Sequence, residues 1–358
     1  MMRLCKAAGT YPQNLALQGI QFEPTPQASG SFGDIYQGML AGYPVSLKVN
    51  RVYKRSKHNV KHFISTYAKE AVVWSQLKHP NLLPFYGIFR LDESHGHGRI
   101  ALVSPWMENG NISEYLSESN PNAARHPLIL DIIEGLGYLH RYSIVHGDLK
   151  GANILITPEG SACLADFGLS SVDHPDILRW TSVSTITPTG GTIRWQAPEL
   201  MTPDEDSRPT LKSDIYSVAS VIYEVIVGKL PYHEYPNNAT VIRQVTLGVL
   251  PTKPSPSQST FLELTEDIWD IMEHCWDTLP ESRPTIEELI SRYNVIEPSP
   301  LTCHRMTEQE RFRMDHNGLV ISGVGLSTPF SQDFRQRLGG HASGLLDVEL
   351  ELLYRLAD

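Results

Sequence analysis

The 358-residue sequence contains few cysteines, no long apolar run and no surplus of basic residues. The cysteines are scattered, without the close spacing of metal ligands or the density of a disulfide framework: Cys5, Cys163, Cys275 and Cys303. No stretch approaches about 18 consecutive apolar residues, and the N-terminus lacks a charged segment followed by an apolar run. We therefore expect neither a membrane span nor a secretory signal, and a cytoplasmic or nuclear protein.

The charge balance is acidic, with 40 Asp and Glu against 30 Lys and Arg and a formal net charge of −10. A general nucleic-acid-binding protein would carry a basic surplus, so nucleic acid is not an expected partner. Hydrophobic residues make up 41% of the chain, which is enough to bury a large core. The length favours one two-lobed domain with tails. No internal repeat is visible, and nothing in the sequence indicates an oligomeric state.

The first third of the chain has sequence patterns typical of β-strands. Residues 31–40 ("SFGDIYQGML") and 43–52 ("YPVSLKVNRV") predict two strands, joined by a hairpin turn at Ala41 and Gly42. Residues 81–90 ("NLLPFYGIFR") and 99–106 ("RIALVSPW") predict two more strands, with a turn at 94–98. One helix is expected to interrupt this sheet and to end before Pro80, with an apolar face formed by Ala71, Trp74, Ser75 and Leu77.

After Trp106 the apolar residues recur at helical spacing. One such series is Leu128, Ile129, Ile132, Ile133, Leu136 and Leu139. Residues 214–227 are apolar nearly all round, which predicts a central buried helix. Thr285 and Glu288 in "RPTIEELISRY" have the capping-box pattern of a late helix. We therefore predict an α+β fold in which a strand-rich lobe precedes a helix-rich lobe.

The stretch 144–155, "IVHGDLKGANIL", concentrates polar side chains between two apolar pairs: His146, Asp148, Lys150 and Asn153. Their spacing is too irregular for one helix face, so we predict a polar loop between two buried strands, although a solvated turn would show the same pattern. A second polar island, "LADFGLS" at 164–170, also follows an apolar strand. Together, Asp148, Asn153 and Asp166 would supply hard oxygen ligands, which suit Mg²⁺ better than Zn²⁺.

Magnesium usually accompanies phosphates, and the stretch "ASGSFGDIY" at 28–36 is a candidate phosphate cradle. Glycine amides can approach anionic oxygens there without a side chain in the way, although Gly-Ser turns are common. Lys48 is the stronger signal, because a lysine between apolar neighbours needs an anion. Glu70 on the expected helix is a natural partner for it, with a phosphate as the second.

These residues together resemble the eukaryotic protein kinases, and more narrowly the tyrosine-kinase-like group, over residues 20–295. The resemblance implies a bilobal fold with a β-rich N-lobe and an α-helical C-lobe, and it implies ATP and Mg²⁺ as cofactors. It also implies proteins as substrates. Ala197, Pro198 and Glu199 match the end of the family's activation segment.

The resemblance implies three catalytic residues: Asp148 as the base, Lys150 near the transferred phosphoryl group and Lys48 on the α- and β-phosphates. The implied ATP-binding residues come from the glycine-rich loop, the Lys–Glu pair, the interlobe hinge and the metal loops: Ala28, Gly30, Ser31, Phe32, Gly33, Ile35, Lys48, Glu70, Ser104, Trp106, Met107, Asn153 and Asp166. Ser104 matches the residue at the back of the adenine pocket. Asn153 and Asp166 are the implied metal ligands.

Six further residues are implied to be structural: His146, Phe167, Gly168, Glu199, Asp214 and Arg283. In the resemblance, His146 packs beneath the metal-binding triplet, and Asp214 anchors the catalytic loop. Arg283 pairs with Glu199. These roles concern the fold of the site and not the transfer itself.

Two positions depart from the family pattern. Ala28 occupies the first position of the glycine loop, where the additional methyl group predicts looser ATP binding. Gly147 replaces the usual arginine of the catalytic loop, so the cation that often reads an activation-segment phosphate is missing. Arg179 and Arg194 lie within the segment and are candidates to replace that cation. Regulation is therefore affected more than catalysis.

The expected reaction is transfer of the ATP γ-phosphate to serine or threonine hydroxyls of proteins. In "DLKGAN" a lysine lies two residues after the base, as in serine/threonine kinases, whereas tyrosine kinases carry an arginine-containing variant. The layout of "GGTIRWQAPE" leaves dual specificity open. The alternatives are a pseudokinase that acts as an ATP-binding scaffold and a small-molecule phosphotransferase, which would lack the "APE" segment.

The expected domain organisation has three parts. Residues 1–18 form a leader, residues 19–297 the kinase domain and residues 298–358 a C-terminal tail. The domain divides into an N-lobe at 19–107 and a C-lobe at 108–297. The stretch "GLLDVELELLYRLA" predicts an amphipathic helix at 344–357.

Overall fold

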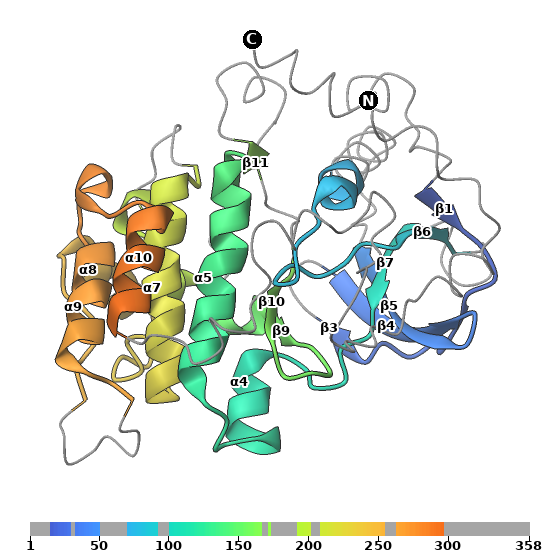
Figure 1. Cartoon of the computed structure of the whole chain (residues 1–358), viewed down its shortest axis with the longest axis horizontal. Coiled ribbons are helices and arrows are strands. Elements are labelled where there is room, and N and C mark those ends of the chain that lie inside the picture. Colours follow the sequence, from blue (N-terminus) through green and yellow to red (C-terminus); the bar gives the residue numbers. More distant parts are fainter. Residues whose placement is uncertain are drawn as a thin grey trace, which may run out of the picture. The chain divides into compact units, whose positions relative to one another are not determined.

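The computed structural model describes residues 15–29, 33–50, 70–91, 100–166, 171–172, 192–201, 208–254 and 263–296. They form two compact units (Figure 1). The sheet-rich unit comprises the described residues of Thr10–Val52 and Gly87–Val103, and the helical unit those of Tyr53–Tyr86 and Ser104–Ser299. The predicted α+β class is confirmed. Most of the predicted leader, the whole predicted tail and the predicted helix at 344–357 lie outside the described residues.

The sheet-rich unit is built on one seven-stranded sheet. The strand order is β1-β6-β7-β5-β4-β2, and β3 also pairs with β4. The β1–β6 pair is parallel, whereas the β2–β4, β3–β4, β4–β5 and β6–β7 pairs are antiparallel. The strand bounds are Ala16–Leu17 (β1), Gln21–Phe22 (β2), Ala28–Ser29 (β3), Gly33–Leu40 (β4), Tyr43–Asn50 (β5), Gly87–Arg90 (β6) and Ile100–Pro105 (β7).

The predicted hairpin is confirmed between β4 and β5. Its two turn residues, Ala41 and Gly42, both have positive φ, 50° and 86°, which is the conformation of a turn that matches the twist of the flanking strands. Along β5 the side chains of Val45, Leu47 and Val49 are buried, and those between them are half-buried. The alternation therefore gives β5 one core face and one more accessible face, and Lys48 lies on the second.

The strand predicted over residues 81–90 is only partly correct, because β6 begins at Gly87. Residues before it belong to the helical unit and pair with a different segment. The Leu83 N–H donates to the Leu164 carbonyl at 2.8 Å, and the Leu164 N–H donates to the Asn81 carbonyl at 2.9 Å. The Trp74 indole also donates to the Leu83 carbonyl, at 2.6 Å. The apolar run is thus divided between two units by its tertiary hydrogen bonds.

A helical segment precedes this extended segment. Residues 70–76 are helical, and the helix ends before Pro80 as predicted. Glu70, Ala71 and Trp74 are buried in the helical unit. The ring of Trp74 packs against that of Phe85 with 5.1 Å between centroids. The helix is therefore fixed by its own unit through the same tryptophan that binds Leu83.

In the described part of the helical unit there are five longer helices (Figure 1): α5 (Arg125–Arg141), α7 (Leu211–Val227), α8 (Asn238–Thr246), α9 (Glu266–Cys275) and α10 (Ile286–Ile296). Its shorter elements are α4 (Ile112–Glu114), η2 (Tyr115–Ser119), η3 (Gly151–Asn153), η5 (Ile193–Trp195), η6 (Pro198–Leu200) and η7 (Pro280–Ser282). Its strands are β8 (Ile144–Val145), β9 (Ile154–Ile156), β10 (Ala162–Leu164) and β11 (Ser171–Val172). The β9–β10 and β8–β11 pairs are antiparallel.

Helix α7 is the central helix of this unit, as its apolar composition predicts. It packs against both α5 and α9, and every residue from Ser213 to Ile226 is buried. It starts with a capping box between Thr210 and Ser213 and ends at Gly228, whose φ is 69°. A helix buried on all sides gives the polar residues it carries, including Asp214 and Glu224, fixed positions under the loops that surround it.

The capping box predicted for the helix within "RPTIEELISRY" is confirmed at the start of α10. The Thr285 N–H donates to Glu288 Oε2 at 2.7 Å, and the Glu288 N–H donates to Thr285 Oγ1 at 3.3 Å. These reciprocal bonds satisfy two backbone donors that would otherwise lack partners at the helix start. The helix boundary thus follows from a local side-chain pattern.

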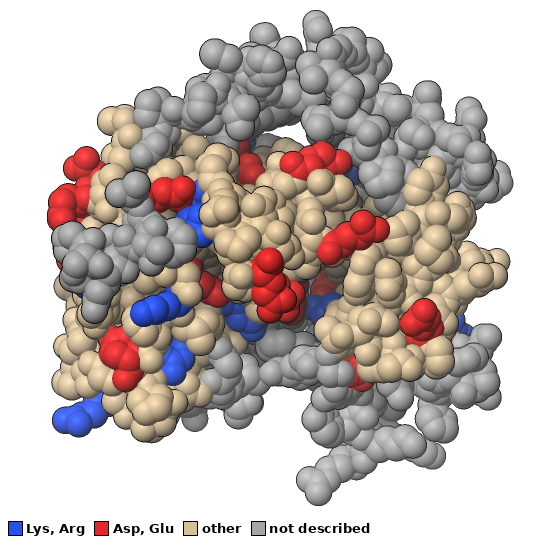
Figure 2. Space-filling view, turned by 90° about the horizontal axis from the view of Figure 1, so that it is seen from below, with Lys and Arg blue, Asp and Glu red and all other residues tan. Residues whose placement is uncertain are grey.

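The surface of the described residues carries charges of both signs on the face drawn in Figure 2, where acidic and basic side chains are interspersed. Neighbouring opposite charges limit the long-range field of such a face.

Among the described residues, no helix combines the length and the apolar character needed to cross a bilayer.

Candidate active site

The polar loop predicted at 144–155 lies between β8 and β9, as expected from the apolar pairs that flank it. Asp214, at the start of α7, holds the first half of this loop. Its Oδ2 accepts the His146 N–H at 2.8 Å, and its Oδ1 accepts the Gly147 N–H at 2.9 Å. The same carboxylate contacts His140 Nε2 at 3.0 Å. Asp214 is 1% exposed, so a buried carboxylate fixes the loop backbone through charge-assisted bonds.

His146 is fully buried and connects the loop to the second polar island. Its Nε2 lies 3.0 Å from the carbonyl oxygen of Ala165, and its Nδ1 lies 3.3 Å from the backbone N of Asp148. Because Nδ1 faces an N–H donor, it accepts, and Nε2 carries the proton that is donated to Ala165. This arrangement gives His146 a structural position, with both ring nitrogens used by the backbone.

Asp148, the predicted base, is 3% exposed, and its two carboxylate oxygens differ in their surroundings. Oδ2 accepts from Lys150 Nζ at 2.6 Å and from Asn153 Nδ2 at 2.9 Å. Oδ1 is buried and has no hydrogen-bond partner. A buried carboxylate oxygen without a donor is costly in a folded protein. Asp148 is therefore fixed by one oxygen and has the other available for an additional donor.

Lys150 joins Asp148 to the segment that precedes the "APE" sequence. Its Nζ donates to Asp148 Oδ2 and also to Thr192 Oγ1, at 3.0 Å. Thr192 is 5% exposed and lies directly before η5. The lysine thus places a positive charge next to the predicted base and ties it to a residue 42 positions further along the chain.

The two predicted metal ligands are brought close by the backbone. The Ala165 N–H donates to the Asn153 carbonyl at 2.9 Å. Asp166 is the next residue after Ala165, so this bond brings the backbone of Asp166 near that of Asn153. Asp166 has φ of 65°, a left-handed conformation that Asp tolerates better than most residues. Among the described residues, no group of three or more His, Cys, Asp or Glu side chains could hold a metal ion by itself.

Glu224 is a site residue that the sequence reasoning missed. This α7 carboxylate accepts from Ser113 Oγ at 2.6 Å, from Trp195 Nε1 at 2.9 Å and from the Gly151 N–H at 3.1 Å. A Cβ on Gly151 would overlap both Glu224 and Ser113, so only glycine allows this approach. Burial raises the pKa of the Glu224 carboxyl above its ordinary value, and its hydrogen bonds oppose that rise.

The three donors to Glu224 come from α4, from the catalytic loop and from η5, so one carboxylate holds three segments together. A signal for it was present in the sequence. Within residues 215–227 of α7 Glu224 is the single charged residue, and a buried carboxylate must find donors. Which donors it finds depends on the fold.

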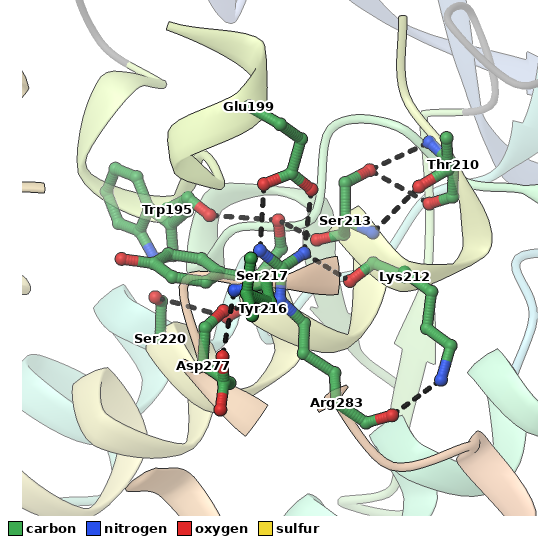
Figure 3. A network of polar contacts seen from close by, with 11 residues as sticks. Trp195, Glu199, Thr210, Lys212, Ser213, Tyr216, Ser217, Ser220, Asp277 and Arg283 are labelled. Carbon is green, nitrogen blue, oxygen red and sulfur yellow. Dashed lines mark hydrogen bonds and ion pairs between the residues drawn. The ribbon is translucent and has the colours of Figure 1, made fainter. Parts of the chain in front are cut away.

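Arg283 and Glu199 lie together in the network drawn in Figure 3, at the C-terminal end of the segment 192–201. Arg283 is 2% exposed and its guanidinium also donates to the carbonyls of Asp277 and Lys212, at 2.8 and 2.9 Å. Ser217 Oγ, from α7, donates to the Trp195 carbonyl at 2.9 Å in the same network. The segment is therefore attached to the core of the helical unit at several points.

Arg194 is not available as a replacement for the missing loop arginine. Its Nη1 donates to the carbonyls of Pro231 and Tyr232, at 3.0 and 2.6 Å, and its Nη2 donates to the Tyr235 carbonyl at 2.8 Å. The expectation that Arg194 reads a segment phosphate is therefore wrong in this structure, because its guanidinium already binds backbone carbonyls. Arg179 lies outside the described residues.

The remaining predicted residues lie as follows. In the sheet-rich unit, Ala28 pairs with Ile35 and Ile35 pairs with Lys48, and Gly33 begins β4. In the helical unit, Glu70 is buried in the helix at 70–76, Ser104 is buried near the end of β7, and Trp106 and Met107 are half-buried. The other predicted site residues are outside the described part of the chain: Gly30, Ser31, Phe32, Phe167 and Gly168. Their ATP-binding and structural roles stay predictions.

Comparison with known proteins connects this geometry to a family. The family model described as "protein tyrosine and serine/threonine kinase" matches residues 26–293. The chain is 27% identical over 301 residues to the serine/threonine-protein kinase STY17 of Arabidopsis thaliana, which covers 83% of this chain and 47% of that protein. It is also 27% identical over 315 residues to the serine/threonine/tyrosine-protein kinase HT1 of Arabidopsis thaliana, with 85% and 74% covered.

A relative from an animal shows the same similarity. The chain is 27% identical over 285 residues to the serine/threonine-protein kinase TNNI3K of Homo sapiens, which covers 78% of this chain. The matched part is 31% of that protein. The chain therefore spans about half of STY17 and about a third of TNNI3K, but about three quarters of HT1.

Proposed function

We propose that this chain, which belongs to the protein tyrosine and serine/threonine kinase family, transfers the γ-phosphate of ATP to serine or threonine hydroxyls of proteins. The observation that carries the proposal is the asymmetry of the Asp148 carboxylate. Lys150 and Asn153 hold Oδ2, whereas Oδ1 is buried without a partner. A hydroxyl group of a substrate is a donor that fits this oxygen.

In this mechanism Asp148 Oδ1 accepts the proton of the attacking hydroxyl group. Lys150, held between Asp148 and Thr192, places its charge where negative charge increases on the transferred phosphoryl group. Asn153 fixes the carboxylate through Nδ2, which also donates to the Asp148 carbonyl at 2.8 Å. Phosphoryl transfer requires chiefly positioning and charge stabilisation, and these three side chains supply both within one loop.

The predicted metal ligands fit Mg²⁺ bound together with ATP. Mg²⁺ is usually held by one or two protein oxygen ligands and by substrate phosphates, and not by a cage of protein side chains. Asn153 and Asp166 provide such a pair, connected by the bond between Ala165 and Asn153. When bound, the metal would neutralise charge on the phosphates. We also propose that Lys48 in β5 and the residues of the glycine-rich loop bind ATP.

Serine/threonine specificity is supported by Lys150, which lies two residues after the proposed base, and by the printed names of STY17 and TNNI3K. The name of HT1 includes tyrosine, so dual specificity is a second candidate. Phosphoamino-acid analysis of a phosphorylated peptide library separates the two. Phosphotyrosine above the level of a catalytically dead variant would support dual specificity.

The test of the transfer reaction is Asp148→Asn, which keeps the size of the side chain and removes the base. We expect transfer to a generic protein to fall at least about 100-fold, because general-base catalysis contributes roughly 10²–10⁴-fold. The thermal shift caused by Mg²⁺ and ATP should persist, because the base contributes little to ground-state nucleotide binding. Asp267→Asn, at an exposed position of α9, is the matched control and should retain the wild-type rate.

The pseudokinase alternative predicts a different set of results. A scaffold would show a Mg²⁺- and ATP-dependent thermal shift, but no transfer above the level of Asp148→Asn. Equal rates for the wild type and Asp148→Asn, measured with the same purified preparation, would reject the proposed enzyme. Loss of both transfer and nucleotide binding in Asp148→Asn would instead reject the specific role of Asp148 as a base.

A further inference from the structure

The segment 192–201 contains an arginine that is stabilised by backbone carbonyls. Arg194 donates to the Pro231, Tyr232 and Tyr235 carbonyls at distances from 2.6 to 3.0 Å, all in the turn that follows α7. Within the described residues it has no ion pair with a carboxylate. Three carbonyl dipoles therefore compensate its charge, and charge-assisted bonds of this kind are stronger than neutral ones.

The turn that provides these carbonyls is held rigidly. Tyr232 has φ of 56°, although it is an aromatic residue with 0% exposure. Such a conformation persists only where the surroundings determine it strongly. The Tyr232 hydroxyl donates to the Val249 carbonyl at 2.9 Å and lies 3.2 Å from the Tyr216 hydroxyl of α7. The carbonyls that bind Arg194 are thus fixed to the central helix.

A second anchor holds the same segment. Glu199, five residues after Arg194, pairs with Arg283 (Figure 3). The Arg283 guanidinium carbon lies 5.2 Å from the centroid of the Tyr216 ring, and Tyr216 contacts Tyr232. The two anchors are therefore connected through Tyr216 and Tyr232, and the segment between them contacts α7.

We propose that Arg194 is a positioning residue for the protein substrate. This inference rests on the proposed function. The fastened segment begins with Thr192, which binds Lys150, and Lys150 binds the proposed base Asp148. A shift of this segment would therefore change the surface beside the base, where the substrate hydroxyl must lie. The proposed metal ligand Asn153 also binds Asp148, but its carbonyl accepts the Ala165 N–H, a contact outside the Thr192–Lys150 connection, so the nucleotide should be affected less.

Three variants separate positioning from general stability. Arg194→Ala removes all the donors, whereas Arg194→Lys keeps one charged donor group that cannot form the planar fork to several carbonyls. Arg243→Ala, at an exposed position of α8, is the matched control for loss of an arginine. None of the carbonyl acceptors is altered in these variants.

The kinetic test uses a peptide phosphorylated by the wild-type chain, with KM measured separately for peptide and for ATP. For Arg194→Ala we expect the peptide kcat/KM to fall by about 10–100-fold, because small displacements near a reacting group can cost that much. The ATP KM should change less than about twofold, and Arg194→Lys should recover part of the loss. Equal increases of both KM values, or an unchanged peptide kcat/KM, would overturn the inference.

Hydrogen exchange provides a readout that does not require transfer. In Arg194→Ala, exchange should increase in peptides covering 193–200 and 231–235 and stay unchanged in α5 and α10. Unchanged exchange in the first two regions would overturn the inference, whatever the kinetics show. If the wild type transfers no phosphate at all, the proposed function fails and so does the substrate role of Arg194, whereas the exchange result still decides whether Arg194 holds the segment.

Discussion

Arg283 and Glu199 face each other through two parallel hydrogen bonds, Nη1–Oε1 at 2.7 Å and Nη2–Oε2 at 2.8 Å. The side chain of Arg283 is 0% exposed and that of Glu199 is 26% exposed. This pair joins the segment 192–201 to the loop before α10. It is the kind of bidentate contact that arginine makes and lysine does not.

The first prediction concerns this pair. Arg283→Ala removes the guanidinium bonds to the Glu199 carboxylate and to two backbone carbonyls, so the free energy of unfolding should fall by about 3–5 kcal/mol. Urea denaturation measures the loss. Arg292→Ala is the control, because its pair with Asp270 is exposed (38% and 56%) and should contribute about 0–1 kcal/mol. Similar losses in the two variants would mean that burial does not distinguish the pairs.

The second prediction concerns Thr192. Thr192→Val keeps the shape of the buried side chain but removes the hydroxyl that accepts from Lys150 Nζ. We expect kcat to fall by about tenfold, because Lys150 loses one of the contacts that orient it beside the base. Thr192→Ser retains the hydroxyl and should stay within about threefold of the wild type. A low kcat in the serine variant as well would point to packing of the methyl group and not to the hydrogen bond.

The third prediction concerns pH and Glu224. Burial raises the pKa of this carboxyl above the ordinary value of 4.5, so the folded state binds its proton more tightly than the unfolded state does. The contribution of Glu224 to stability is therefore full below pH 4.5 and decreases as the pH rises toward the raised pKa. Glu224→Gln removes the titrating group and therefore this decrease. The unfolding free energy of the wild type minus that of the variant should become smaller as the pH rises through that window. A constant difference would contradict the direction of the pKa shift.

The fourth prediction concerns Lys48. Its side chain lies on the half-buried face of β5, opposite to the core residues Val45 and Leu47. If it binds the phosphates of ATP, Lys48→Met should leave less than about a tenth of the wild-type activity. Lys229→Met, at an exposed position after α7, is the matched control. Activity above that level in Lys48→Met would mean that another lysine fulfils the role.

The fifth prediction concerns activation. Gly147 provides no cation to bind a segment phosphate, and Arg194 is occupied by carbonyls. We therefore expect the chain to be basally active. After phosphatase treatment, verified by mass spectrometry, the initial rate should fall by less than about tenfold, because no arginine of the loop depends on the phosphate. A larger loss, restored by phosphate on one segment residue, would show that another cation reads it.

The elements that sequence analysis predicted well depend on local interactions. The positive φ of Ala41 and Gly42 makes a two-residue turn, and the Thr285–Glu288 capping box lies within four residues of chain. The apolar composition of residues 214–227 similarly requires burial on all sides. The polar loop at 146–153 was also predictable, because polar residues between buried strands must lie in a turn.

The partition of residues 81–90 could not be predicted from the pattern. A short apolar run can form a strand in either unit. Hydrogen bonds to Leu164, which is distant in the sequence, and to Trp74, which lies in the preceding helix, place residues 81–86 in the helical unit. The sequence indicated one strand, whereas the tertiary structure divided the run at Gly87. Non-local pairing of this kind carries no local signal.

The sequence by itself indicated the family and the proposed catalytic groups, because Lys48, Asp148, Asn153 and Asp166 occur in a characteristic order within recognisable local motifs. Only the tertiary structure decided what holds them. The three donors of Glu224 come from segments up to 111 residues away, and the charge of Arg194 is compensated by carbonyls 37 to 41 residues further on. The physical reason is that every buried donor and acceptor needs a partner, but a chain meets most of its partners only after it has folded.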